Sequence, residues 1–141
     1  MKGRRPAVKR QTTSPALGEK PDGFLTPEPP PWLGYFASET WRNTITALTD
    51  SGRRIPQAHL EAFIGYCQCA GQAREASEVL THEGLTADGG RQGLRRHPAV
   101  MIHTTALQML RGYAESLGLT PGSAGRLPQT PIVKKSKFDD L

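Results

Sequence analysis

The sequence predicts a mainly helical, all-α protein with one small β-hairpin. Three long segments carry apolar residues every three to five positions, close to the period of an amphipathic helix. A proline stands near the start of each segment and a glycine follows its end, as is typical of helix boundaries. Nine of the 12 prolines lie outside residues 32–127. We therefore expect a helical domain at 31–127, a basic, Pro-rich flexible arm at 1–30 and a flexible tail at 128–141.

The first two helices are expected at 31–49 and 56–82, and Gly52 and Gly84 follow them as stop signals. The apolar face of the first helix contains Trp32, Phe36, Trp41, Ile45 and Leu48. The second helix carries the small residues Gly65, Ala70, Gly71, Ala73 and Ala76. Small residues let another helix approach closely, but glycine contributes little to helix formation. Packing against other helices or other copies must therefore hold the second helix.

A glycine-rich hairpin is expected at 84–95, because Asp88-Gly89 suits the positive φ angles of a tight turn. The third helix is expected to begin at Pro98 and to end at Gly118. A short fourth helical turn is expected at 121–127.

The third helix carries mainly apolar residues at steps of three and four, which is the spacing of a coiled-coil seam. One copy of so small a domain buries limited apolar surface. We therefore predict that this seam joins copies into a homo-oligomer, and a head-to-tail interface that closes on itself would give a ring. The seam consists of Val100, His103, Leu107, Leu110, Ala114 and Leu117.

The sequence contains no recognisable catalytic, metal or cofactor motif. A Gly-x-x-x-x-Gly-Lys-Ser/Thr phosphate loop and a His-Glu-x-x-His pair are both missing. Cys67 and Cys69 are predicted to be packing residues, because buried thiols usually act as small apolar groups. Spacing does not group the cysteines with the histidines, which are His59, His82, His97 and His103. We expect no enzymatic activity, no metal and no cofactor.

Neither membrane insertion nor secretion is expected. No stretch approaches the roughly 18 consecutive apolar residues of a membrane span. The basic start of the chain leads into Gln-Thr-Thr-Ser-Pro rather than into an apolar segment.

The basic charge is concentrated at the start of the chain. Residues 1–20 carry six Lys or Arg residues against Glu19, and such a segment can follow a phosphate backbone by releasing counterions. Two arginine pairs lie in connections between helices, where guanidinium groups suit phosphate oxygens. The alternative is that these charges only keep the protein in solution. The predicted nucleic-acid-binding residues are Lys2, Arg4, Arg5, Lys9 and Arg10 in the arm, and Arg53, Arg54, Arg95 and Arg96 in the connections.

Residues 24–127 resemble the small terminase subunits of tailed double-stranded-DNA phages. The first half of the resemblance consists of Trp32-Leu33, Trp41, Ile45, Leu48, Ile55-Pro56, Leu60-Glu61-Ala62-Phe63 and Tyr66-Cys67. The second half consists of Glu83-Gly84-Leu85, the glycine-rich hairpin, His97-Pro98-Ala99-Val100, Ala106-Leu107, Leu110-Arg111, Leu117-Gly118-Leu119-Thr120-Pro121, Ser123 and Arg126-Leu127.

The resemblance implies a non-enzymatic packaging factor in the cytoplasm of the host cell. Members of this family assemble as rings and recognise the packaging-initiation region of the viral DNA. They also recruit and regulate the large terminase subunit, which carries the ATPase and nuclease activities. Within the tail, we predict a docking segment for the large subunit at Lys134, Lys135, Lys137 and Phe138.

Two other classes of protein fit the same residues. A small helical DNA-binding regulator would act as a monomer or dimer, with the turn at Ser51 and Gly52 resembling that of a helix-turn-helix. A structural or adaptor protein of the virion would use its tails to bind protein. The regulator would form no large ring, and the adaptor would show no salt-dependent affinity for DNA.

Overall fold

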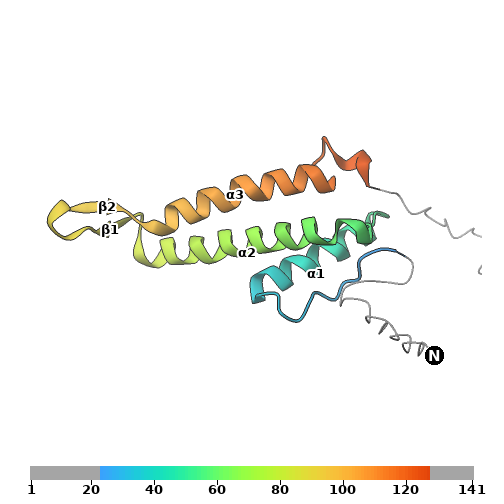
Figure 1. Ribbon diagram of the computed structural model, residues 1–141, viewed down its shortest axis with the longest axis horizontal. Coiled ribbons are helices and arrows are strands. Elements are labelled where there is room, and N and C mark those ends of the chain that lie inside the picture. The colour runs from blue at the N-terminus through green and yellow to red at the C-terminus, as the bar shows by residue number, and fades with distance from the viewer. Residues whose placement is uncertain (1–22, 128–141) are drawn as a thin grey trace, which may run out of the picture.

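The computed structural model describes residues 23–127, in which three helices pack side by side (Figure 1). They are α1 (Tyr35–Asp50), α2 (Leu60–Glu83) and α3 (Pro98–Leu117). The central helix is α2, with α1 packed along one side and α3 along the other. An antiparallel hairpin of β1 (Thr86–Asp88) and β2 (Leu94–Arg96) joins α2 to α3 and projects beyond the helices. The predicted mainly helical fold with one small hairpin is confirmed.

The small residues of α2 allow close approach on two sides. A Cβ atom at Gly71 would lie 3.2 Å from the backbone nitrogen of Ala37 on α1. A Cβ atom at Gly65 would lie 2.6 Å from Cζ of Tyr113 on α3. Because both sides of α2 are covered, its sequence carries no single apolar stripe.

The apolar core lies where α1, the first half of α2 and the end of α3 meet. The ring of Trp41 on α1 lies 4.6 Å, centroid to centroid, from the ring of Phe63 on α2, and both side chains are fully buried. The indole N–H of Trp41 donates a hydrogen bond of 2.9 Å to the carbonyl oxygen of Thr26. Full burial of an apolar side chain such as that of Phe63 contributes about 1.5–3 kcal/mol to the stability of the fold. Ile55, Leu117 and Cys67 are the other large, fully buried side chains of this region.

The leading segment, residues 23–33, packs against the helices. Leu25 is buried, and its backbone N–H donates to the carbonyl of Ile55 over 3.0 Å. The backbone N–H of Gln57 donates to the carbonyl of Gly23 over 2.8 Å. The prolines predict an N-terminal arm that extends to residue 30, whereas the structure packs residues 23–30 against the helical body.

The predicted start of the first helix is wrong by four residues. The helix begins at Tyr35, not at Pro31. Prolines 29–31 disfavour a helical backbone in the residue before each of them. A turn follows, in which the N–H of Leu33 donates to the carbonyl of Pro30 over 3.1 Å. Trp32 therefore lies outside the helix, with 63% of its surface exposed.

Two segments that the sequence predicts as helical form 3₁₀ turns instead. The second helix opens with the turn η1 (Gln57–His59), and α2 itself begins at Leu60. The expected short fourth helix at 121–127 is the single turn η3 (Ala124–Arg126). Before it, Gly118 ends α3 as predicted, with a left-handed φ of 77°. A Cβ atom there would lie 2.9 Å from the carbonyl oxygen of Ser123.

The hairpin turn is longer than predicted. Instead of a tight turn centred on Asp88-Gly89, the strands are joined by a loop that contains the 3₁₀ turn η2 (Gly90–Gln92). The positive φ angles fall at Gly90 and Gly93, and not at Gly89. A Cβ atom at Gly89 would lie 2.5 Å from the carbonyl oxygen of Gly93, so the loop needs this glycine for close backbone approach.

Candidate nucleic-acid interface

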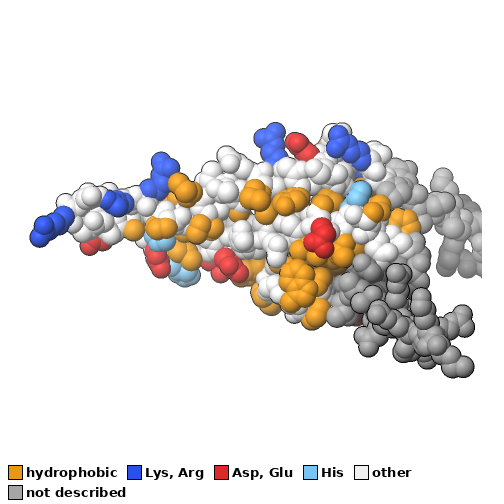
Figure 2. Space-filling view, viewed as in Figure 1, with side chains coloured by type: hydrophobic (Ala, Val, Ile, Leu, Met, Phe, Trp, Pro, Cys, Tyr) orange, Lys and Arg blue, Asp and Glu red, His pale blue; other side chains and the backbone are white. Residues whose placement is uncertain are grey.

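The hairpin carries the more exposed of the two predicted arginine pairs. Arg95 and Arg96 lie on β2, and both are exposed. Arg95 pairs with Ala87 and Arg96 with Thr86, so the alternation of a strand directs the two side chains to opposite faces. Figure 2 shows basic side chains around the projecting end of the molecule. Phosphate groups can therefore reach guanidinium groups on either face of this ribbon.

A third exposed arginine on the hairpin was missed at the sequence level. Arg91 lies in η2 at the hairpin turn. Arg91 stands alone in a glycine-rich loop, so it lacks the adjacent basic partner that marks the two predicted pairs. A count of charge over the whole hairpin would have included it.

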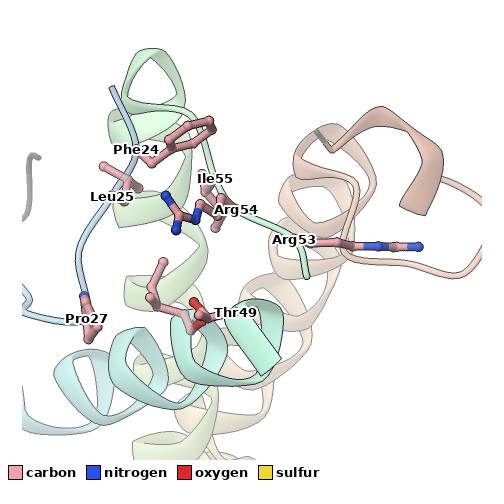
Figure 3. A pocket seen from close by; sticks show the side chains of 8 residues that line it. Phe24, Leu25, Pro27, Thr49, Arg53, Arg54 and Ile55 are labelled. Carbon is pink, nitrogen blue, oxygen red and sulfur yellow. The ribbon is translucent and has the colours of Figure 1, made fainter. Parts of the chain in front are cut away.

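The second predicted pair, Arg53 and Arg54, lies in the turn between α1 and η1, and both side chains are half-buried. The guanidinium carbon of Arg54 lies 5.4 Å from the ring centroid of Phe24, which is within the range of a cation–π contact. Figure 3 shows Arg54 beside Phe24 and Ile55, with Arg53 directed away from them. They line a small pocket of about 80 Å³, together with Phe24, Leu25, Pro27, Ile45, Thr49 and Ile55. The two guanidinium groups of this pair therefore do not form one exposed basic site.

The two arginine pairs lie at opposite ends of α2 (Figure 1). This helix has 24 residues, which corresponds to about 36 Å at the helical rise. One phosphate group cannot contact both pairs in the same chain.

The predicted oligomer seam is divided between the inside and the outside of the chain. Leu117 is 1% exposed and belongs to the chain's own core. Leu107 is exposed. The helical period places Val100 and Ala114 on the same flank of α3 as Leu107. The half-buried residues of the seam are Val100, His103, Leu110 and Ala114.

Sequence reasoning missed a second apolar flank on α3. Met101, Ile102 and Met109 are exposed large apolar residues. Ile102 and Met109 are seven residues apart and share a side of α3 different from that of Leu107. Figure 2 shows a band of apolar side chains along the α2–α3 pair. The spacing of three and four residues that starts at Val100 does not include these residues. A pattern with a single apolar seam therefore leaves them out.

His97 connects the hairpin to both long helices. Its Nδ1 atom accepts a hydrogen bond of 3.0 Å from the backbone N–H of Ala99 and so caps α3. Its Nε2 atom lies 2.6 Å from a carboxylate oxygen of Glu83 at the end of α2. The backbone N–H of His97 donates to the carbonyl of Leu85 over 2.8 Å. This residue therefore fixes the base of the hairpin.

The cysteines do not form a reactive site. Cys67 and Cys69 are both buried. Burial raises the pKa of the Cys67 thiol to about 12 and raises the pKa of Cys69 as well, so both remain protonated at neutral pH. Between residues 23 and 127, no group of three or more His, Cys, Asp or Glu side chains is arranged to hold a metal ion.

Among the helices that the structure describes, none is both long enough and apolar enough to cross a membrane.

An exposed aromatic group surrounds the start of α1. Trp32 and Tyr35 are mostly exposed, and the ring of Tyr35 lies edge-on to Phe36 at 5.4 Å. The guanidinium carbon of Arg74 on α2 lies 4.4 Å from the ring centroid of Phe36, and the same guanidinium group pairs with Glu39 at 2.8 Å. The sequence predicts Trp32 on the apolar face of the first helix, because the helix is expected to start at residue 31.

Two groups of predicted site residues lie outside the described residues. The first is the arm group of Lys2, Arg4, Arg5, Lys9 and Arg10, and the second is the tail group of Lys134, Lys135, Lys137 and Phe138.

The chain matches a known family. A family model described as phage terminase, small subunit, matches residues 37–132, which is more than half of the chain. The matched region includes most of α1 and all of α2, the hairpin and α3. Searches among curated proteins and among solved structures gave no match.

Proposed function

The chain belongs to the phage terminase small subunit family, and on that premise we propose that it is the non-catalytic, DNA-binding component of a viral genome-packaging motor. In this role it recognises the packaging-initiation region of the viral DNA, and it recruits and regulates the large terminase subunit. It acts in the cytoplasm of the host cell and needs no cofactor.

The observation that carries the DNA-binding proposal is the projecting hairpin. Three exposed arginines, Arg91, Arg95 and Arg96, lie within six residues on a ribbon that extends past the helices. Phosphate contacts position a protein on DNA without reading its sequence. The basic arm at 1–20 adds charge, and Arg53 and Arg54 add a weaker contact at the other end of α2.

Self-assembly is proposed through the two apolar flanks of α3. Val100, Leu107 and Ala114 form one flank, and Ile102 and Met109 form the other. Two different patches on different sides of one chain favour a head-to-tail contact, which closes into a ring if the rotation permits. Several copies would then multiply the modest DNA affinity of each hairpin and arm.

Salt-dependent DNA binding tests the hairpin. We expect Arg95→Ala with Arg96→Ala to weaken binding to duplex DNA and to reduce the slope of log K against log salt by about 1.8 per chain, because two phosphate contacts are lost. The matched control is Arg42→Ala with Arg111→Ala, which removes the same charge from exposed positions on α1 and α3. Equal losses in both double variants would exclude a specific role of the hairpin.

The arm and the other arginine pair complete the same titration. Deletion of residues 2–20 should weaken DNA binding most, because it removes the largest charge. Arg53→Ala with Arg54→Ala should weaken it less than deletion of the arm does. A larger loss from the Arg53 and Arg54 variant would move the main DNA contact to the α1–η1 turn.

Native mass tests the assembly. We expect a single closed species of several copies, and we expect Leu107→Glu or Met109→Glu to break it, since each places a charge on an apolar flank. Leu110→Glu, in the half-buried part of the seam, should also block assembly, and the full oligomer mass in that variant would exclude the seam as an interface. Gln108→Glu is the control, because it adds the same charge at an exposed position of α3 between the flanks. A monomer or dimer in the unaltered protein would instead favour a small DNA-binding regulator.

Recruitment of the large subunit is proposed to use the tail residues Lys134, Lys135, Lys137 and Phe138. A pull-down of the large subunit should fail when residues 128–141 are deleted and should survive when Arg53 and Arg54 are replaced by alanine. Retention of the large subunit by the tail-deleted chain would exclude the tail as its docking segment.

A further inference from the structure

The base of the hairpin contains an open groove that its own elements leave uncovered. The groove has a volume of about 520 Å³ and is lined by Leu85, Thr86, Leu94, Arg95, Arg96 and Val100. Leu94 is 77% exposed and Leu85 is 67% exposed. Two short paired strands are at best marginally stable without further cover. The lining therefore combines apolar side chains with two cationic groups, as a docking surface does.

The composition of the groove restricts what can occupy it. Duplex DNA can satisfy the two arginines, but its phosphate backbone offers nothing apolar to cover Leu85 and Leu94. A matching occupant presents apolar and acidic side chains next to each other. The basic arm at 1–20 does not fit, because Arg95 and Arg96 would repel it.

We propose that the segment Phe138–Leu141 of the same chain docks in this groove. It reads Phe-Asp-Asp-Leu, so it offers acidic groups to Arg95 and Arg96 and apolar groups to Leu85 and Leu94, all of which line the groove. A segment with two acidic residues between two apolar ones suits a lining that combines arginines with apolar side chains.

The tail is long enough to reach the groove. Leu127, the last described residue, lies beside Gly118 at the end of α3, since a Cβ atom at Gly118 would lie 3.1 Å from Cγ of Leu127. From Gly118 back to Val100 along α3 is about 27 Å at the helical rise. The 11 residues from 128 to 138 can span up to about 36 Å. Because the tail is tethered to the groove's own chain, its effective concentration there exceeds that of a free partner.

Docking of the tail also regulates DNA binding, and this consequence rests on the proposed function. Asp139 and Asp140 would occupy the same guanidinium groups that we propose for phosphate contact. The docked tail and DNA would then compete for Arg95 and Arg96, and DNA binding would release the tail.

A spin label in the full-length chain tests the docking without any DNA. The label is attached at Ser136→Cys, since the buried native thiols of Cys67 and Cys69 stay protonated and are poor targets for the reagent. We expect it to remove most of the methyl signal intensity of Leu85, Leu94 and Val100. A label at Thr130→Cys, close to Leu127, is the positional control and should leave these three methyl groups visible.

Two variants locate the contact. Adding Leu94→Ser or Arg96→Ala to the labelled chain should restore the Val100 methyl signal, and Arg91→Ala, outside the groove, should leave it suppressed. An unaffected Val100 signal in the original labelled chain would overturn the proposal, as would suppression that Leu94→Ser and Arg96→Ala do not relieve.

Mixing identifies the source of the tail. Spin-labelled chains are mixed with isotope-labelled chains that carry no spin label. We expect no loss of methyl signal in the mixture, and a loss there would overturn docking within one chain in favour of a second copy.

The competition with DNA is measured separately. Asp139→Asn with Asp140→Asn should tighten DNA binding by about threefold, which corresponds to about 0.65 kcal/mol. Failure of the unaltered protein to bind DNA would refute the proposed function while leaving the spin-label result standing. Unchanged DNA affinity in the Asn variant would refute the competition alone.

Discussion

At one end of α2, Trp41 and Phe63 are fully buried against each other, whereas at the other end Leu85 and Leu94 are mostly exposed. The core end is closed by the leading segment, by α1 and by the last turn of α3. Within residues 23–127, nothing comparable covers the hairpin end, and every residue of β2 is exposed. Both ends carry apolar side chains and arginines, so composition does not separate them.

The difference indicates how the chain divides its apolar surface between folding and binding. At the core end that surface is buried within one copy and stabilises the fold. At the hairpin end and along the flanks of α3 it remains exposed for contacts with other molecules or other parts of the chain. Substitutions at the core end should therefore change stability, and substitutions at the hairpin end should change binding.

The largest effect is expected from Trp41, with Trp32 as its exposed counterpart. Trp41→Ala should lower the free energy of unfolding by about 3–5 kcal/mol, because it empties the core and leaves the carbonyl of Thr26 without its indole donor. Trp32→Ala, at an exposed position, should change it by less than about 0.5 kcal/mol. Chemical denaturation measures both. Similar losses in the two variants would mean that the core is not concentrated around Trp41.

A smaller effect is expected from the glycine that ends α3. Gly118→Ala should destabilise the protein by about 1–3 kcal/mol, since its backbone is left-handed and the new Cβ would meet the carbonyl of Ser123 at 2.9 Å. Gly112→Ala, in the same helix with open space around it, should stabilise by up to about 1 kcal/mol. Thermal unfolding of the pair should give shifts of opposite sign. Two shifts of the same sign would contradict the close contact at the end of α3.

The junction between the two ends is probed by His97. His97→Ala should cost about 1 kcal/mol by removing the cap of α3, and it should speed amide hydrogen exchange in the hairpin. His97→Asn keeps a capping side chain and should recover most of the stability, but not the link to Glu83. Exchange in the core helices near Trp41 should speed by no more than the roughly fivefold factor that the global loss of about 1 kcal/mol implies. Equal acceleration throughout the chain would show that the hairpin does not open separately.

The smallest effect on stability is expected at the hairpin itself. Leu94→Ser should change the free energy of unfolding by no more than about 0.5 kcal/mol, although it replaces a leucine, because that side chain is largely exposed. Leu117→Ala, a buried leucine near the core end, should cost about 2–5 kcal/mol. Chemical denaturation of both variants measures this difference as a shift of the midpoint at an unchanged denaturant slope. A large loss from Leu94→Ser would mean that the hairpin end supports the fold as well.

The sequence predicted the helices well where local signals determine them. Pro98 and Gly118 bound α3 as expected, because a proline at the first helical position and a left-handed glycine after the last are local requirements. The start of α1 was mispredicted since the apolar period continues through Trp32, while the prolines before it and a turn keep the backbone out of a helix. Periodicity alone cannot separate these two influences.

The candidate site was less predictable because it depends on tertiary contacts. Adjacent arginines look equivalent in sequence, but Arg54 lies beside Phe24 and Arg95 is exposed on a strand. The seam spacing placed Leu117 and Leu107 on one line, and the packing of α3 on α2 buries the former and exposes the latter. Which side of an apolar helix faces its own chain is decided by the partner helix.

The two-sided packing of α2 sets a limit on how this chain can be dissected. A fragment ending after α2 would leave the face around Gly65 without Tyr113, and a fragment starting at α2 would leave Phe63 without Trp41. Neither half contains a complete interior. The three helices therefore belong to one cooperative folding unit, and loss of α1 should abolish functions located at the opposite end of the molecule.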